Sequence, residues 1–198
     1  MTLQIRRKIN EWLRRIPIWL VWLLGLIPLA LLILDGFRGN LGVDPVVSIE
    51  HRLGKTALYF LIGGLCATPV TRLLRVNLIR FRQAVGLLAF TYAVLHLIAW
   101  AVFDMGLRWS QALSDIVKRP YLTLGMIAFV ALIPLAVTSN RASIRRLGAA
   151  GWQKLHRLVY VAVPFAALHY LWVGKVAKPE PLLWIAIITI LLLYRLRT

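Results

Sequence analysis

Residues 83–103 read QAVGLLAFTYAVLHLIAWAVF, and His96 is the only side chain among them that titrates near neutral pH. As a helix rising 1.5 Å per residue, this stretch would be roughly 31 Å long, which matches the hydrocarbon core of a bilayer at about 30 Å. An ionisable side chain at that depth is costly and normally faces the protein interior or a cavity. The stretch therefore predicts a membrane-spanning helix with a functional histidine on its inner face.

The rest of the chain extends this pattern. Hydrophobic residues make up 60% of the 198 positions, and the mean hydropathy is +0.76, whereas soluble domains are about 45–50% apolar. We expect an all-α integral membrane protein with a single domain over residues 1–198, a basic segment at 1–16 and a bundle of about six transmembrane helices. The expected spans are approximately 17–34, 55–73, 83–103, 120–138, 154–173 and 181–194.

The charges predict how the spans are oriented. The formal net charge is +17, but the basic residues are unevenly placed. The N-terminal segment, alternate loops and the C-terminal end hold sixteen of the basic residues and only one acid, Glu11. The positive-inside rule places these segments, and so both termini, in the cytoplasm. This distribution argues against nucleic acid as the partner and for contact with lipid.

A second histidine, His169, lies in the expected fifth span, which runs in the same direction as the third. His96 is about 13 residues into its span and His169 about 15, so their depths differ by roughly 3 Å. Two imidazoles at one depth on separate helices are suited to the two axial positions of a haem iron. Small residues precede both histidines by three and seven positions: Ala93 and Ala89 before His96, and Ala166 and Ala162 before His169. They would leave lateral room for a macrocycle, although small residues also line helix contacts that hold no cofactor.

His156 lies roughly 20 Å from His169 along the expected fifth span, near the inner surface. The third span offers no histidine at that depth, and Arg82 stands there instead. The sequence leaves open a five-coordinate second haem, an anionic cofactor held by Arg82, or an ordinary interfacial histidine. His51, at the outer mouth of the second span, is either a surface or capping residue or one that faces haem propionates.

The segments RQAVGLLAFTYAVLHLIAW (82–100) and GWQKLHRLVYVAVPFAALHYLW (151–172), together with GKTAL (54–58), carry a resemblance. They resemble the ferric-reductase-like transmembrane domain shared by NADPH oxidases and ferric reductases. They are more closely similar to the haem-binding membrane subunits of bacterial protein-methionine-sulfoxide reductase systems. The histidines of that group map to His96, His156 and His169. NADPH oxidases carry two histidine pairs, so Arg82 in place of the fourth puts a second haem in question.

This resemblance implies a haem b cytochrome of the bacterial inner membrane, with FMN as a further cofactor. It implies electron flow from the quinone pool or a cytoplasmic flavin reductase to a periplasmic molybdopterin-dependent methionine sulfoxide reductase. The chain would carry electrons without bond-making catalysis of its own. Two alternatives remain at this point: a cytochrome b anchor of another respiratory dehydrogenase, and a small transporter with a histidine proton relay, although every acid lies in a loop or at a span end.

Overall fold

The computed structural model describes residues 3–174 and 179–196, which form helices joined by short connections, without a strand in these ranges. The α-helices are α1 (Leu3–Arg15), α2 (Ile18–Phe37), α3 (Pro45–Leu74), α4 (Arg82–Ala99), α5 (Trp109–Lys118), α6 (Pro120–Val137), α7 (Arg141–His156), α8 (Val159–Val173) and α9 (Pro179–Leu196). A 3-10 turn, η1 (Ile79–Phe81), precedes α4, and a π-helical segment, η2 (Trp100–Asp104), extends it. The expected all-α membrane bundle is confirmed.

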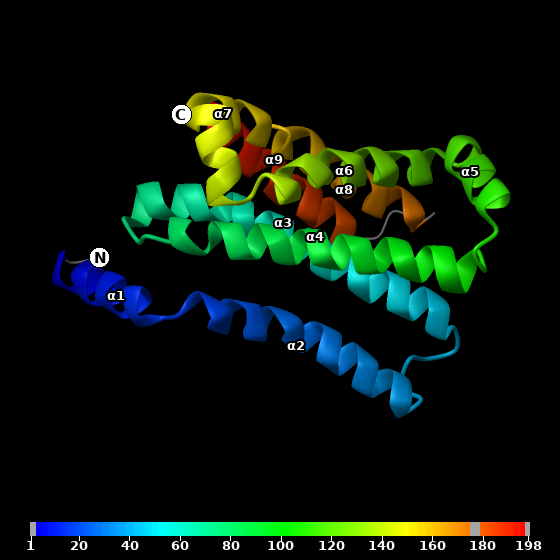
Figure 1. The fold of residues 1–198 in the computed structure, drawn as a ribbon. Helices are drawn as coiled ribbons and strands as arrows, with labels where there is room; N and C mark the ends of the chain where they lie inside the picture. The colour runs from blue at the N-terminus through cyan, green and yellow to red at the C-terminus, as the bar shows by residue number, and fades with distance from the viewer. Residues whose placement is uncertain (1–2, 175–178, 197–198) are drawn as a thin grey trace.

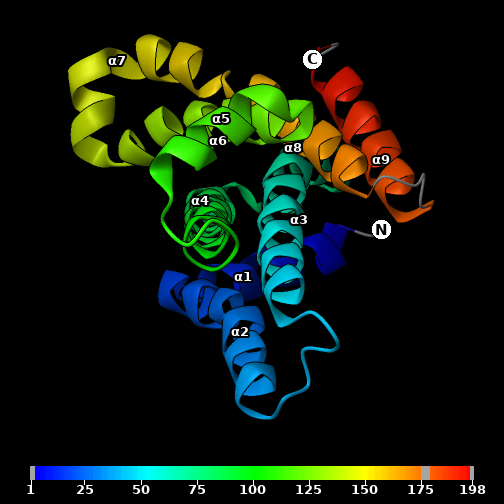
Figure 2. The same cartoon turned by 90° about the vertical axis from the view of Figure 1, so that its right-hand side faces the viewer.

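Four segments within the described ranges are long and apolar enough to cross a membrane: α2, α3, the continuous unit Ile79–Asp104 and α6. Figure 1 shows them running side by side with α8 and α9. Viewed along the bundle in Figure 2, α3 and α4 lie in the middle, with α2 on one side and α6, α8 and α9 on the other. The protein is therefore a multi-pass membrane protein.

Two helix boundaries differ from those expected. Helix α3 begins at Pro45 rather than near residue 55, because Asp44 accepts a hydrogen bond from the backbone N–H of Val47 at 3.1 Å and proline suits the first helical position. The expected span 154–173 is interrupted: α7 ends at His156 and α8 starts at Val159. His156 and His169 therefore lie on different helices, and α7 bends at Gly148, whose φ is +69°.

Helix α2 approaches α4 closely at Gly25. A Cβ atom at Gly25 would lie 2.3 Å from Cδ1 of Leu88, so only glycine permits this contact. The buried Tyr92 hydroxyl donates to the Gly25 carbonyl at 2.8 Å and accepts the Leu29 N–H at 3.0 Å. The Tyr92 hydroxyl thus lies between the Leu29 N–H and the Gly25 carbonyl of α2, which are four residues apart, and it joins α2 to α4.

Helix α9 is fixed to α3 at both ends. Near its start, Glu180 accepts hydrogen bonds from Lys55 at 2.9 Å and Tyr59 at 3.0 Å, and the bond from Lys55 holds the pKa of Glu180 below its usual value. At its other end, Arg195 donates to the Leu65 carbonyl at 2.9 Å. That carbonyl lacks its usual helical partner because Pro69 has no N–H.

Candidate haem site

A cavity of about 420 Å³ lies between α3, α4, α6 and α8. His96 from α4 and His169 from α8 both line it. Their ring centroids are 6.1 Å apart, and their planes are inclined at 65°. The structure therefore brings together the two histidines that the sequence placed at one depth.

The two rings are oriented in the same way. Nδ1 of His96 is 2.9 Å from the Glu50 carbonyl oxygen, and Nδ1 of His169 is 2.7 Å from the Tyr121 carbonyl oxygen. A carbonyl can only accept, so each Nδ1 carries the proton and each Nε2 keeps a free lone pair. This arrangement is typical of metal-binding histidines, whose second nitrogen is fixed by a backbone or carboxylate acceptor.

A glycine flanks each histidine. A Cβ atom on Gly54 of α3 would lie 3.2 Å from Cε1 of His96, and one on Gly125 of α6 would lie 3.0 Å from Nδ1 of His169. Each glycine stands four residues after the residue whose carbonyl accepts the Nδ1 proton, Glu50 or Tyr121. Sequence reasoning assigned neither glycine to the site. The available signal was a glycine inside an expected span for Gly125, and one directly before an expected span for Gly54.

The spacing fits a haem iron. Two metal–nitrogen bonds of about 2.0 Å, plus about 1.1 Å from each Nε2 to its ring centre, place the centroids of trans-axial imidazoles roughly 6 Å apart. The centroids of His96 and His169 are 6.1 Å apart. Within residues 3–174 and 179–196, no group of three or more His, Cys, Asp or Glu side chains is placed to hold a bare metal ion. Two histidines alone suit a metal whose other ligands come from a macrocycle.

Of the four alanines that precede the two histidines, two line the cavity and two lie in the core. Ala93 and Ala166, three residues before the histidines, line the cavity. Ala89 and Ala162 are fully buried in the core and do not line it. Seven residues of helix correspond to roughly 10 Å, which takes the second alanine of each stripe beyond the cavity.

The end of the cavity next to η2 and the start of α3 is polar. Glu50, His51, Lys55 and Asp104 line it there, and Lys55 is engaged by Glu180. His51 is an exposed side chain at this mouth. It lines the cavity but is not one of the two facing histidine rings.

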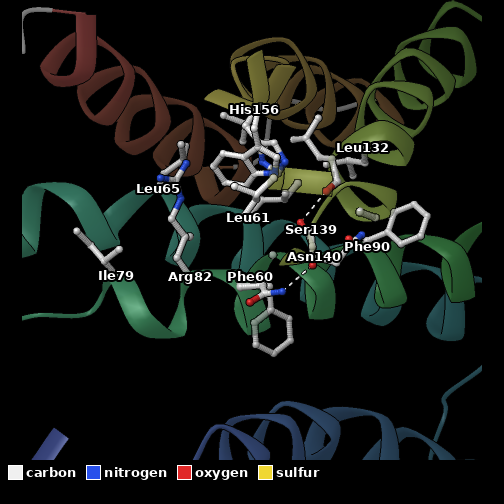
Figure 3. A pocket seen from close by; sticks show the side chains of 18 of the residues that line it. Phe60, Leu61, Leu65, Ile79, Arg82, Phe90, Leu132, Ser139, Asn140 and His156 are labelled. Atoms are coloured by element: carbon white, nitrogen blue, oxygen red, sulfur yellow. Dashed lines mark hydrogen bonds between the residues drawn. The ribbon is translucent and has the colours of Figure 1, made fainter. Parts of the chain in front are cut away.

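A second cavity of about 320 Å³ lies toward the end of the bundle that carries α7, and Figure 3 shows it. Arg82 and His156 both line it, and Figure 3 shows them entering from α4 and from α7. Leu61 and Leu132 line both cavities and form the partition between them. We call the 420 Å³ space the outer cavity and the 320 Å³ space the inner cavity.

His156 is held by neighbours of its own. Its ring stacks on Trp152 with centroids 3.7 Å apart, and its Nε2 is 3.1 Å from the Thr138 hydroxyl. No other histidine lines the inner cavity among the residues that the structure places. The structure thus pairs His156 with Thr138 and Trp152, opposite Arg82.

The sequence matches the family model described as "Ferric reductase like transmembrane component" over residues 53–167. The chain belongs to this family. The matched region takes in parts of α3, α4, α6 and α8, the helices that line the outer cavity, and it includes His96, whereas His169 lies just beyond it.

Curated relatives carry a more specific name. Two proteins called "Protein-methionine-sulfoxide reductase heme-binding subunit MsrQ", from Brucella anthropi and Brucella ovis, are each 46% identical to the chain. The alignments cover 94% of this chain and 83% of the first relative, and 90% of this chain and 81% of the second. No solved structure matches the chain.

Proposed function

We propose that this chain is the haem-binding membrane subunit of a protein-methionine-sulfoxide reductase system. In this role it is a b-type cytochrome that carries electrons from the quinone pool or a cytoplasmic flavin reductase to a periplasmic molybdopterin-dependent reductase, which repairs oxidised methionines. The observation that carries the proposal is the 6.1 Å separation of the His96 and His169 rings, each with Nδ1 on a backbone carbonyl. The name of the Brucella relatives, haem-binding subunit of protein-methionine-sulfoxide reductase, supports the proposal.

Residues of α3, α4, α6 and α8 line the outer cavity. His96 and His169 would hold the haem iron through Nε2, and the Glu50 and Tyr121 carbonyls fix both rings. Ala93 and Ala166 leave lateral room. A haem b held there would supply one-electron transfer, because two histidine ligands leave the iron no open position.

The charge pattern supports an orientation. We place the end of the bundle with α1 and α7 in the cytoplasm, because Arg and Lys gather there and acids gather at the other end. Residues 1–198 then form one membrane domain of the bacterial inner membrane, with both termini inside. The His96–His169 pair lies in the periplasmic half, on the side of the partner reductase.

For the inner cavity we propose the anionic cofactor, FMN, over a second haem. His156 has no second histidine across this cavity among the placed residues, and its Nε2 lies against Thr138. Arg82 supplies a positive charge in its place. The cavity would take FMN's phosphate near Arg82 and its ring system near the Trp152–His156 stack.

Reduced-minus-oxidised spectra of purified protein test the haem assignment. His96→Ala and His169→Ala should each abolish the sharp alpha band of a low-spin b haem, because one axial ligand is lost. His156→Ala is the matched control and should keep that band, since its ring is in the inner cavity. A full band in either of the first two variants would refute the pairing.

A further inference from the structure

The wall of the inner cavity is cationic. Arg82 from α4, Arg141 from α7 and Arg195 from α9 all line it, and no aspartate or glutamate does. The seven acids of the chain lie elsewhere: Glu11, Asp35, Asp44, Glu50, Asp104, Asp115 and Glu180. Among the residues that the structure describes, this wall therefore has no carboxylate side chain to offset the guanidinium charges.

Two of these guanidinium groups have unused donors. Arg195 donates from Nη2 to the Gly64 and Leu65 carbonyls of α3 and to the Thr68 hydroxyl. Its Nε is buried without an acceptor. The Arg82 guanidinium makes no hydrogen bond to another residue in the described ranges, and it lies within electrostatic range of Arg195. The two side chains line one space, Arg82 from α4 and Arg195 from α9.

Arg82 and Arg195 are both partly buried, and like charges repel one another more strongly in a partly desolvated site than in water. An anion between the two groups offsets this repulsion. Guanidinium donors match phosphate oxygens in geometry and in charge. Beside them, the Trp152–His156 stack offers a flat apolar surface.

We propose that Arg82 and Arg195 together bind the phosphate group of an organic phosphate in the inner cavity. This deepens the proposed function by naming Arg195, on the C-terminal helix, as the second half of the phosphate site. The phosphate belongs either to a soluble phosphomonoester or to a phospholipid headgroup. Arg195 also donates to the Leu65 carbonyl freed by Pro69, so this contact with α3 holds Arg195 at the cavity.

The first arm uses FMN and riboflavin, which differ only by the phosphate. Purified protein should bind FMN at least about tenfold more tightly than riboflavin in a flavin-fluorescence titration, as expected for charge-assisted hydrogen bonds to one phosphate. Arg195→Met and Arg82→Met should each bring the two affinities to within about twofold. Arg146→Met removes the same charge from an exposed position of α7 that does not line the cavity, and it should keep the preference.

The second arm tests a lipid source. Delipidated protein is titrated with phosphatidic acid or phosphatidylcholine and analysed by native mass spectrometry, with the same variants. A phosphatidic acid preference that disappears in Arg195→Met and Arg82→Met assigns the site to a headgroup. The proposal is overturned if neither phosphate probe is preferred, or if both variants keep the preference.

Arg82→Met guards against a folding artefact, because the Arg82 guanidinium makes no hydrogen bond within the described chain, whereas the Arg195 guanidinium also holds α3. The haem spectrum is recorded on every sample as a separate readout. Loss of the phosphate preference with an intact alpha band supports the site. If wild-type protein shows no alpha band, the proposed haem function fails. The FMN and riboflavin comparison then still decides whether the phosphate site exists.

Discussion

Gly125→Ala is the sharpest test of the outer cavity. The new Cβ would lie 3.0 Å from Nδ1 and 3.1 Å from Cε1 of His169, whereas ordinary contacts begin at 3.4 Å. The ring must therefore move by roughly 0.4 Å, away from the Tyr121 carbonyl that fixes it at 2.7 Å. Metal–ligand distances tolerate only about 0.2 Å, so the shift should weaken the axial bond.

Overpacking of this kind costs about 1–3 kcal/mol, which corresponds to about a ten- to hundredfold loss of haem affinity. Gly54→Ala approaches His96 less closely, at 3.2 Å, and should lose less. Gly63→Ala is the matched control on α3, because its Cβ would lie 3.8 Å from the nearest atom, on Val85. Haem content and affinity are measured by titrating apoprotein with haemin, and helix content by circular dichroism.

The expected order of affinity is wild type and Gly63→Ala, then Gly54→Ala, then Gly125→Ala. Equal affinity and an unchanged low-spin spectrum in Gly125→Ala would show that the glycine does not position His169. A loss of helix content in the same sample would mean that the bundle, and not the ligand, had been disturbed, and Gly54→Ala would then decide the matter.

Two further outcomes test how the bundle is held together. Tyr92→Phe removes the hydroxyl that joins the Leu29 N–H to the Gly25 carbonyl, so the thermal midpoint should fall by an amount equivalent to about 1–2 kcal/mol; an unchanged midpoint would mean that α2 closes its own hydrogen bond without loss. Because Lys55 lowers the pKa of Glu180, the stabilisation from this pair is present at neutral pH and is lost as pH falls through the lowered pKa. Glu180→Gln should therefore lower the midpoint slightly at pH 7, and this effect should shrink as the pH falls through the lowered pKa. An effect that stays constant over the whole acidic range would contradict the pairing.

The sequence by itself determined that the chain is a helical membrane bundle and that His96 and His169 share a depth. Hydropathy and a rise of 1.5 Å per residue are properties of single segments, so they can be read without knowing which helices touch. The break between His156 and Val159 was not predicted, because neither glycine nor proline stands between these two residues and Pro164 lies several residues further on. An uninterrupted span was the wrong interpretation at that point.

Only the tertiary structure decided what surrounds the histidines. The Glu50 carbonyl is 46 residues from His96, and the Tyr121 carbonyl is 48 residues from His169. Arg195 meets Leu65 across 130 residues. The sequence does not show which distant ring a carbonyl or a glycine will face, because that depends on the rotation and crossing of packed helices. The local pattern set the depth of each group, and packing set its direction.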